Sequence, residues 1–385
     1  MDATAKSIPT FNIGIVGLGF IGRLHAQAYL SLPYCFTQPK VHARIHAILR
    51  SHLGDHIDFL NNLNNPTVTT QVDEFYSQSI DLVDICTPNH LHLNQTIEAM
   101  DRGKHVYCEK PLGRNLADAR KIVAHSQKAG VLTHTAFMMR YLPAVYQMKA
   151  ILENNGIGDI YHFRGRLFHG SYLDPKRPMS WRLRHADAGG GVLSDLGIHL
   201  LDLVNFLIGK VKWVQCQTRT FIIQRPKVIG SSEMETVDVD DWALCMLGLE
   251  NGATGAIEVT RVAGGVDECS ELEIYGQHGS LRMNVENPMM IEYYDAQLKQ
   301  WKIGMQDFPS PASLRPIEQL WPPSKQSMGF MLNAHLASAY DFLQCVAEKK
   351  ESPINFKEAL VAQEILEAAY LSASRNSERI HLPLN

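Results

Sequence analysis

The sequence predicts an α/β protein built from two or three domains. The chain has 385 residues, and a domain averages about 150 residues. Over the first third, short apolar runs alternate with amphipathic stretches, which is typical of parallel β-α-β units with both faces of the sheet covered. After about residue 138, longer apolar runs follow one another without intervening helices, which favours a second, mostly antiparallel sheet.

Each strand of the first part is expected from a short apolar run, and each helix from the amphipathic stretch behind it. The run FNIGIV at 11–16 is mostly apolar, as in a strand that is buried on both faces. The other strands are expected at 43–49, 81–86, 105–109 and 131–136, and the helices at 21–29, 93–102 and 116–129.

The second part contains runs rich in Val, Thr and aromatic residues. We expect strands at 160–169, 211–223, 241–250, 252–262, 271–276 and 289–295. Asn251-Gly252 separates two of these runs and is a strong hairpin signal. Helices are expected at 143–154, 192–208, 328–349 and 356–374. These elements predict one domain at 1–137, a second at 138–350 with a large open sheet, and a C-terminal helix within 351–385 that returns to the first domain.

Composition and charge exclude several classes of protein. Hydrophobic residues make up 45% of the chain and charged residues 20%, as in a globular rather than a disordered protein. Lys and Arg number 36 against 40 Asp and Glu, a net charge of −4 without a basic block, so we expect neither a nucleic acid nor a membrane as partner. The longest apolar stretch, 192–208, contains Asp195, His199 and Asp202, which argues against a spanning helix.

The cysteines and the first residues favour the cytoplasm. The seven cysteines are scattered without a C-x-x-C pair, so neither a disulfide framework nor a zinc site is expected. The segment MDATAKSIPTFN has no apolar signal core and no small-residue cleavage pattern. We therefore expect a protein of the reducing cytoplasm that binds no metal.

A glycine-rich hexapeptide lies between the first strand and the first helix. In the spacing G-x-G-x-x-G, the first glycine allows a tight turn, the second lets a pyrophosphate approach the backbone, and the third lets the helix pack on the strand. We expect dinucleotide contacts from Gly17, Gly19, Phe20, Ile21 and Gly22. The alternative is a glycine-rich turn that serves packing alone.

The end of the second strand bears on the choice between the two nicotinamide cofactors. A carboxylate there binds the ribose hydroxyls of NAD, whereas a cation accommodates the 2′-phosphate of NADP. Arg50 and Ser51 occupy this position, and Asp55 and Asp58 lie too far along the chain to serve as ribose ligands. The sequence therefore favours NADP(H), unless Arg50 is an ordinary solvated charge.

Lys110 follows another predicted strand of the first part, in the segment Cys108-Glu109-Lys110-Pro111. Ligands of open α/β sheets bind outside the carboxyl ends of the strands. An ammonium group at such an end can donate a hydrogen bond to a substrate oxygen, and a neighbouring positively charged nicotinamide would ease its deprotonation. A lysine after a strand is more often simply solvated, so this assignment needs support from elsewhere in the chain.

The predicted helix at 192–208 provides that support. Asp195, His199 and Asp202 occur at i, i+4 and i+7, and so share one face of an otherwise apolar helix. Three ionisable groups are costly to bury there without a purpose. Histidine is suited to exchange a proton near neutral pH. A core histidine bonded to a carboxylate is the structural alternative, and a zinc site is disfavoured because no fourth ligand lies at a useful spacing.

Together these residues resemble the glucose–fructose oxidoreductase / inositol dehydrogenase (Gfo/Idh/MocA) family. The resemblance implies a Rossmann domain joined to a C-terminal α/β domain on a large open, mostly antiparallel sheet, with the active site between them. It runs over nearly the whole chain and includes the glycine motif, Thr87-Pro88-Asn89 with His92, Glu109-Lys110-Pro111, Trp181-Arg182, Gly197-x-His199-x-x-Asp202 and the closing helix.

The resemblance also implies roles for individual residues. His199 would be the acid/base at the reacting hydroxyl, Lys110 would polarise that oxygen, and Asp195 would bind substrate and tune His199. The nicotinamide half of the cofactor would be lined by Thr87, Asn89, His92, Glu109 and Lys110 and covered by Trp181 and Arg182, and Arg140 would lie near the domain boundary as a substrate-side residue.

The expected substrate is a secondary alcohol on a sugar, cyclitol or glycoside, with C3 of a glucose-like ring as the specific hypothesis. His169 and Tyr172 lie in a polar and aromatic segment, 169–181, that is suited to bind hydroxyl groups, and no cluster of Arg and Lys is evident there for a phosphate. Two alternatives stay open: a glycosidase of the same family that recycles its cofactor, and a non-catalytic dinucleotide sensor. The apolar sheet of the second domain further predicts a homodimer or homotetramer.

Overall fold

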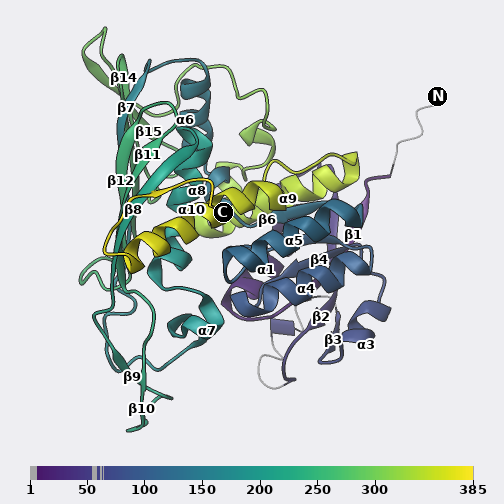
Figure 1. The fold of residues 1–385 in the computed structure, drawn as a ribbon. Helices are drawn as coiled ribbons and strands as arrows, with labels where there is room; N and C mark the ends of the chain where they lie inside the picture. The colour runs from purple at the N-terminus through teal and green to yellow at the C-terminus, as the bar shows by residue number, and fades with distance from the viewer. Residues whose placement is uncertain (1–6, 54–58, 61–62, 64, 385) are drawn as a thin grey trace, which may run out of the picture.

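Residues 7–53, 59–60, 63 and 65–384 are described by the computed structural model (Figure 1). The first part of the chain forms a six-stranded sheet in the order β3-β2-β1-β4-β5-β6, and every strand pair in it is parallel. The order reverses between β1 and β4, where the carboxyl ends of the strands open a crevice for ligands. The strands are β1 (Thr10–Val16), β2 (His42–Leu49), β3 (Thr67–Thr69), β4 (Leu82–Ile85), β5 (His105–Cys108) and β6 (Thr133–Thr135).

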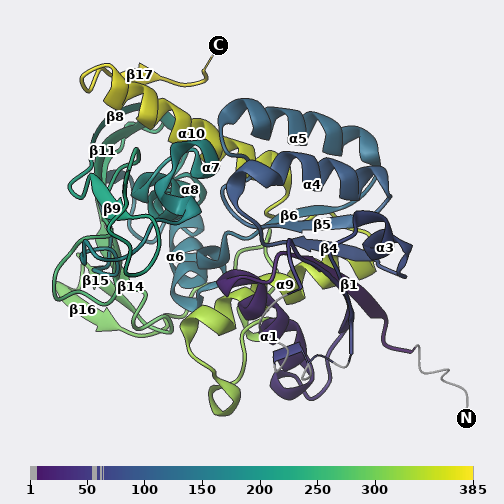
Figure 2. The same cartoon turned by 90° about the horizontal axis from the view of Figure 1, so that it is seen from below.

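Helices cover both faces of this sheet, as the sequence predicts. Figure 2 shows α4 (Asn89–Asp101) and α5 (Leu116–Ala129) on one face and α1 (Phe20–Cys35) on the other. Beside α1 lies α9 (Phe330–Glu348), which comes from the far end of the chain. The short strand β3 and the following helix α3 (Val72–Ser77) were not predicted, because three residues carry too little of a periodic pattern.

The second part forms a nine-stranded sheet in the order β16-β15-β14-β13-β7-β12-β11-β8-β17. All neighbouring pairs are antiparallel except β7 and β12, so the predicted mostly antiparallel sheet is confirmed. Its strands are β7 (Ile160–Phe168), β8 (Val211–Arg219), β11 (Trp242–Leu249), β12 (Thr254–Thr260), β13 (Cys269–Gly276), β14 (Gly279–Asn284), β15 (Ile291–Asp295), β16 (Gln300–Ile303) and β17 (Ile380–His381).

The second part contains a tight turn within the large sheet and a separate small hairpin. Asn251-Gly252 lies between β11 and β12, where the sequence predicts a hairpin, and Gly252 has a positive φ of 89°. A separate hairpin, β9 (Gln224–Pro226) and β10 (Met234–Thr236), projects away from the large sheet in Figure 1. Residues at the base of this second hairpin reach the candidate site described below.

The helices of the second part lie on one face of the large sheet. In Figure 1, α6 (Pro143–Glu153), α8 (Ile198–Leu207) and α10 (Phe356–Ser374) cover that face, and no described helix covers the other. Helix α10 contacts both α5 of the first part and β8 of the second, so it lies between the two sheets. The short helices are η1 (Met138–Tyr141), η2 (Trp181–Leu183), α7 (His185–Ala188), η3 (Leu193–Gly197), η4 (Ile317–Gln319) and η5 (Ser324–Gln326).

The predicted helix at 192–208 consists of two pieces with different windings. Leu193–Gly197 is π-helical and Ile198–Leu207 is α-helical. π-Helical turns within helices are frequent at functional sites. The stretch His185–Leu207 is long and apolar enough to cross a membrane by length and composition alone, but 78% of its most apolar window is buried inside the protein, as in a core helix. The predicted domain boundaries near 138 and 351 stay predictions.

Candidate active site

The glycine-rich turn after β1 has the shape that a diphosphate requires. Gly17 has a φ of 91°, and a Cβ on Gly22 would lie 2.1 Å from the Gly17 carbonyl oxygen, so these two glycines serve the turn and the packing. A Cβ on Gly19 would meet no atom within 4 Å. Helix α1 begins at Phe20 with no cap from a described side chain, so backbone N–H groups face that open space. These residues therefore fit the diphosphate of a dinucleotide.

Arg50 and Ser51 lie where the sequence predicts them, directly after β2. The Leu49 carbonyl accepts a hydrogen bond of 2.9 Å from the Gly17 amide, which places the end of β2 beside the glycine turn. The Arg50 amide donates to the Thr69 carbonyl at 3.0 Å, and the Ser51 hydroxyl lies 2.9 Å from Nδ1 of His52. Asp55 and Asp58 lie outside the described residues.

The residues after β4 bind the surrounding loops together. Oγ1 of Thr87 donates to Gln95 at 2.5 Å, and the Asn89 amide group donates to the Ala188 carbonyl at 2.8 Å. The buried ring of His92 lies 2.9 Å from the Pro111 carbonyl and 3.0 Å from that of Thr87, and burial lowers its pKa. His92 thus links the loop after β4 to the loop that carries Lys110.

Glu109 and Lys110, which follow β5, point in different directions. The buried carboxylate of Glu109 lies 3.2 Å from Nε2 of His25 in α1, on the core side of the strand end. The predicted contact of this carboxylate with nicotinamide stays a prediction. The Lys110 ammonium donates hydrogen bonds to the Asp195 backbone oxygen at 2.5 Å and to Oδ1 of Asp195 at 3.0 Å. One residue of the pair therefore faces the core and the other faces the second domain.

Two cationic side chains, Lys110 and Arg182, lie next to the Asp195 carboxylate. Besides Lys110, the Arg182 guanidinium lies 3.7 Å from Oδ2 of Asp195 and packs over the Trp181 ring at 4.3 Å. Burial by itself would raise the pKa of Asp195, but the charges of Lys110 and Arg182 hold that pKa well below its usual range. The side chain is therefore an anion that fixes Lys110 and Arg182 in place.

His199 lies one helical turn further along the same segment. Its ring is buried edge-on to Phe137, with centroids 6.2 Å apart, and its Nδ1 has no hydrogen-bond partner among the described residues. Burial and the charge of Lys110 lower the pKa of His199 to about 3, although the charges of Glu109 and Asp195 oppose this shift. The imidazole is therefore neutral at physiological pH and has a lone pair with which to accept a proton.

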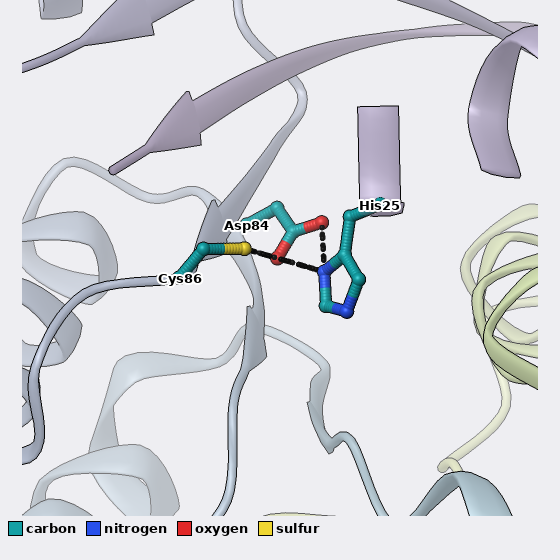
Figure 3. A group of neighbouring side chains, drawn as sticks. All are labelled: His25, Asp84 and Cys86. Carbon is teal, nitrogen blue, oxygen red and sulfur yellow. Dashed lines mark hydrogen bonds and ion pairs between the residues drawn. The ribbon is translucent and has the colours of Figure 1, made fainter. Parts of the chain in front are cut away.

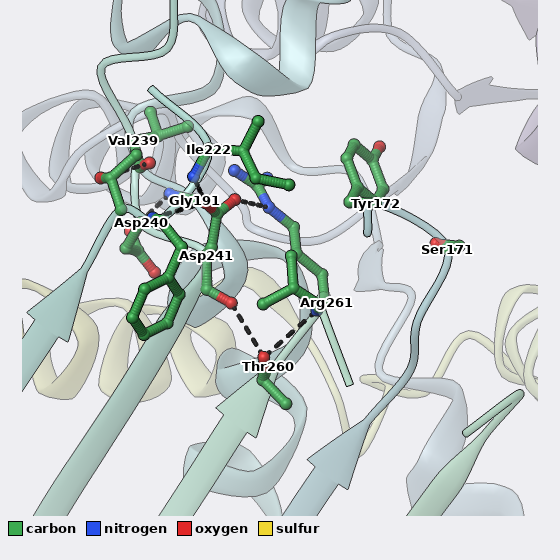
Figure 4. Close-up of polar contacts among 12 residues, drawn as sticks. Ser171, Tyr172, Gly191, Ile222, Val239, Asp240, Asp241, Thr260 and Arg261 are labelled. Atoms are coloured by element: carbon green, nitrogen blue, oxygen red, sulfur yellow. Dashed lines mark hydrogen bonds and ion pairs between the residues drawn. The ribbon is translucent and has the colours of Figure 1, made fainter. Parts of the chain in front are cut away.

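Asp240 holds the start of the segment that carries these residues (Figure 4). Its carboxylate accepts hydrogen bonds of 2.8 Å from the amides of Gly191 and Leu193, and one of 2.9 Å from the Tyr370 hydroxyl. Sequence reasoning missed Asp240. The triple glycine before a helix without its own cap indicates that another segment must supply one, but nothing in the sequence identifies which segment.

Arg140 and Asp202 form a buried ion pair. Arg140 was expected on the substrate side, and Asp202 was expected to share a face with the catalytic residues. The structure pairs them with each other: Nε and Nη2 of Arg140 donate to the two carboxylate oxygens of Asp202 at 2.8 and 2.5 Å, and both residues are buried. Arg140 also packs over the Phe206 ring at 4.5 Å. The structure therefore shows a core ion pair here, and the predicted substrate contact of Arg140 stays a prediction.

The segment 169–181 begins near Asp195, whose charge acts on the His169 ring. His169 hydrogen-bonds through Nδ1 to the Ser171 hydroxyl at 2.9 Å, and its pKa is lowered by burial even though the charge of Asp195 opposes the shift. Its ring lies 6.2 Å from that of Tyr172. Tyr172 is buried and its backbone amide donates to the Arg261 carbonyl at 3.0 Å, which anchors the segment on the end of β12.

The expectation that no arginine cluster gathers here was wrong. The guanidinium groups of Arg177, Arg261 and Arg225 lie 4.1, 4.8 and 5.9 Å from the Tyr172 ring. Figure 4 shows Arg261 beside Tyr172 and paired with Asp241, at 2.9 Å. Arg225 donates to the carbonyls of Asp174 and Tyr172, and Arg177 donates to that of Ser171. The sequence hid the cluster because two of its members come from distant segments. Each guanidinium makes contacts within the protein, while Nη2 of Arg261 and Nε of Arg225 have no hydrogen-bond partner among the described residues.

Comparisons with known proteins identify relatives of both parts of the chain. Residues 11–137 match the oxidoreductase family with an NAD-binding Rossmann fold, and residues 145–282 match the GFO/IDH/MocA C-terminal domain. A levoglucosan dehydrogenase of Pseudarthrobacter phenanthrenivorans is 30% identical over 95% of this chain and 97% of its own length. A glucose-6-phosphate 3-dehydrogenase of Bacillus subtilis is 26% identical over 78% of this chain and 81% of its own.

Solved structures give the same result for the fold. A levoglucosan dehydrogenase in complex with NADH and levoglucosan superposes with a TM-score of 0.87 at 29% identity, over 97% of this chain and 100% of the other. The predicted fold class and the expected binding of a nicotinamide dinucleotide are therefore confirmed.

Proposed function

Because the chain belongs to the Gfo/Idh/MocA family of NAD-dependent oxidoreductases, we propose that it transfers a hydride between nicotinamide and a secondary alcohol or ketone of a sugar, cyclitol or glycoside. The observation that supports this activity best is the meeting of Lys110 from the first domain with Asp195 of the second, next to the neutral His199. A relative named for levoglucosan and another named for glucose 6-phosphate support a sugar as the substrate class.

The three side chains divide the chemistry between them. When bound, the nicotinamide supplies the hydride acceptor. Neutral His199 accepts the proton of the reacting hydroxyl, which needs a base that is unprotonated at the working pH. The Lys110 ammonium donates a hydrogen bond to the same oxygen and stabilises the negative charge that develops there. Asp195 keeps the ammonium in place through its carboxylate and its backbone oxygen.

The remaining predicted contacts belong to the substrate and the cofactor. We assign His169 and Tyr172 to the hydroxyl groups of the sugar, and Trp181 with Arg182 to the cover over the nicotinamide. The three arginines near Tyr172 contact carbonyls and Asp241, but Nη2 of Arg261 and Nε of Arg225 have no hydrogen-bond partner among the described residues, so the uncharged ring rests on the sequence hypothesis alone. Within that class, oxidation at C3 of a glucose-like ring is the specific hypothesis.

Turnover of a substrate panel tests the activity. Purified protein would be incubated with NAD⁺ or NADP⁺ and levoglucosan, glucose, myo-inositol or a methyl glucoside, with absorbance at 340 nm and product mass as readouts. We expect reduced cofactor and a product lighter by two hydrogens. Cleavage of the glucoside without net reduced cofactor would identify the glycosidase alternative. Cofactor binding without turnover of any compound would favour the dinucleotide sensor.

Preference for NADP(H) is a separate proposal that rests on Arg50. The residue follows β2 beside the glycine turn, where a 2′-phosphate would lie. We expect the dissociation constant of NADPH to be lower than that of NADH, and Arg50→Ala to remove most of the difference. Equal dissociation constants in the wild-type protein would refute the assignment and leave the fold untouched. Calorimetric titration measures both constants directly.

We also propose a homodimer or homotetramer in the cytoplasm, formed through the face of the large sheet that no described helix covers. Tyr161 of β7 and Met246 of β11 are 58% and 51% exposed, which is unusual for apolar side chains in the middle of a sheet. Met246 lies on a face that also carries the ion pair of Arg166 with Glu271, and a second copy would bury the exposed apolar side chain there. Light scattering at micromolar concentration decides the matter, since a species with the mass of one chain would refute it.

A further inference from the structure

A second group of ionisable side chains lies on the core side of the strand end that carries Lys110. It consists of His25 in α1, Glu109 directly after β5, and His335 in α9. Nε2 of His25 lies 3.0 Å from Nδ1 of His335 and 3.2 Å from Oε1 of Glu109. The three residues are only 3%, 4% and 6% exposed, in the order His25, His335 and Glu109. The function proposed above uses none of these contacts.

The other nitrogen of His25 is already satisfied. Nδ1 lies 3.0 Å from Oδ2 of Asp84, and the same carboxylate oxygen accepts a hydrogen bond of 2.9 Å from Tyr29. Figure 3 shows Nδ1 turned toward Asp84 and Cys86, and the second ring nitrogen pointing away from both. A carboxylate only accepts hydrogen bonds, so Nδ1 carries a proton, and a metal ion would displace only the proton on Nε2. Histidines that bind metals typically have this arrangement, with a carboxylate behind the ring.

Hydrogen bonding leaves one atom of the group unpaired. Oε1 of Glu109 is buried and has no hydrogen-bond partner among the described residues. Nε2 of His25 carries at most one hydrogen, and the geometry directs that hydrogen to His335 rather than to Glu109. A buried carboxylate oxygen without a donor is costly. A cation between the three atoms would satisfy both nitrogens and this oxygen at once.

Charge and spacing point the same way. Asp84 and Glu109 are two buried carboxylates, and the nearest ammonium, that of Lys110, is engaged with Asp195. A divalent cation held by neutral imidazoles would balance the two negative charges. Metal–ligand distances of about 2.1 Å place neighbouring ligand atoms roughly 3.0–3.4 Å apart. The two separations from Nε2 of His25, 3.0 and 3.2 Å, fit that range, and all three ligand atoms lie within 4.8 Å of one another.

We propose that His25, His335 and Glu109 bind a divalent transition-metal ion, with Asp84 as the carboxylate that orients His25. Two imidazole nitrogens and one carboxylate oxygen suit zinc best among the common metals. Cys86 is not a ligand, because its sulfur lies on the Nδ1 side of the His25 ring, 3.3 Å from that nitrogen. The ion would connect α9, which lies at the end of the predicted second domain in sequence, to α1 and to the strand end that carries Lys110. Its role is structural, and the proposal departs from the sequence-based expectation of no metal.

Metal analysis of the whole protein tests the proposal without any assay of activity. The chain would be purified without a polyhistidine tag and its metal content measured by plasma mass spectrometry. We expect about one zinc ion per chain in the wild-type protein, a loss of at least tenfold in Glu109→Gln and His335→Gln, and roughly 10–100-fold weaker zinc affinity in Asp84→Asn.

His134→Gln is the matched control. His134 is fully buried in the same domain and stacks on Tyr107 at 4.8 Å, but its nitrogens bond to Ser352 and Ser338 rather than to the group. This variant should keep its zinc. If the variants at the ligands fail to fold, the wild-type protein decides alone: it should be stripped by a chelator and should regain zinc and thermal stability on titration. A wild-type chain that contains no metal and takes up none at micromolar zinc would overturn the proposal and leave a hydrogen-bonded network.

Discussion

Two ion pairs on one helical segment make an instructive comparison. Asp195 and Asp202 lie seven residues apart, and each is paired with a cation from the preceding part of the chain, Lys110 and Arg140 respectively. The Asp195 side chain keeps 33% of its surface exposed, whereas that of Asp202 keeps 2%. The first pair is a lysine with a carboxylate and a backbone oxygen, and the second is a two-pronged arginine–carboxylate contact.

The difference separates chemistry from architecture. An ammonium group has three hydrogens, and two acceptors on Asp195 leave Lys110 one for a substrate oxygen. The Arg140 donors that face Asp202 are used within the core, where burial raises the pKa of Asp202 although the charge of Arg140 opposes the shift. Removing the first pair should therefore affect turnover, and removing the second should affect folding. The following changes test that separation.

The largest effect is expected on turnover, when groups at the partly exposed site of the Lys110–Asp195 pair are removed. His199→Ala and Lys110→Ala should each lower kcat by about 10²–10⁴-fold, since the first removes the group that accepts the proton and the second removes the group that stabilises the negative charge on the reacting oxygen. The dissociation constant of the cofactor, measured by fluorescence titration, should stay within a few-fold of wild type. Normal turnover of Lys110→Ala would remove that residue from the mechanism, and equal loss of cofactor affinity and turnover in His199→Ala would favour a structural histidine.

Both domains of this fold could be predicted from the sequence because their signals are local. Apolar runs predicted the strand before the glycine turn and the strands that follow helix α1, and Asn251-Gly252 predicted a hairpin that the structure contains. The meeting of Lys110 with Asp195 could be anticipated only through the family resemblance. The pattern of apolar and polar residues along a strand or helix does not predict a hydrogen bond between residues that are 85 positions apart.

The next effect concerns the stability that comes from the buried pair of Arg140 with Asp202, the closed pair. Arg140→Met and Asp202→Asn should each lower the free energy of unfolding by about 3–5 kcal/mol, because each leaves a buried polar or charged partner uncompensated. The double variant Arg140→Met with Asp202→Leu should recover much of that loss, and urea denaturation measures all three. Lys110→Ala should lose only about 0–1 kcal/mol, since its pair is partly exposed. A single variant at Asp202 with wild-type stability would show that the closed pair is not structural.

What the sequence could not reveal was the choice of partners in the core. In the sequence, Asp195, His199 and Asp202 are three ionisable residues on one helical face, and nothing there distinguishes their roles. Tertiary packing determines the partner of each. Arg140 pairs with Asp202, and Asp240 from another loop caps the start of the segment. The Glu109 carboxylate contacts His25 on the core side of the strand end. Such pairings connect residues that are remote in sequence, so they become visible only once both sheets are assembled.

The smallest effect is expected on the pH dependence of stability, and it compares two histidines. Burial and the charge of Lys110 lower the pKa of His199 to about 3, and burial and the charge of Arg140 lower that of His134 to about 3. Both rings stay neutral in the native protein while the unfolded chain takes up protons below the ordinary pKa of 6.5. Each histidine therefore contributes stability that is present above pH 6.5 and is lost as the pH falls toward 3.

Urea denaturation at a series of pH values between about 7 and about 4 measures this loss of stability. Each neutral histidine steepens the fall of the unfolding free energy by at most about 1.4 kcal/mol per pH unit. His134→Gln should therefore flatten the slope and leave kcat unchanged, because its ring bonds only to Ser352 and Ser338. His199→Ala should flatten the slope by a similar amount and also abolish most turnover. If His134→Gln left the slope unchanged, His134 would be protonated in the native protein, and the contrast between a core histidine and a catalytic one would fail at that residue.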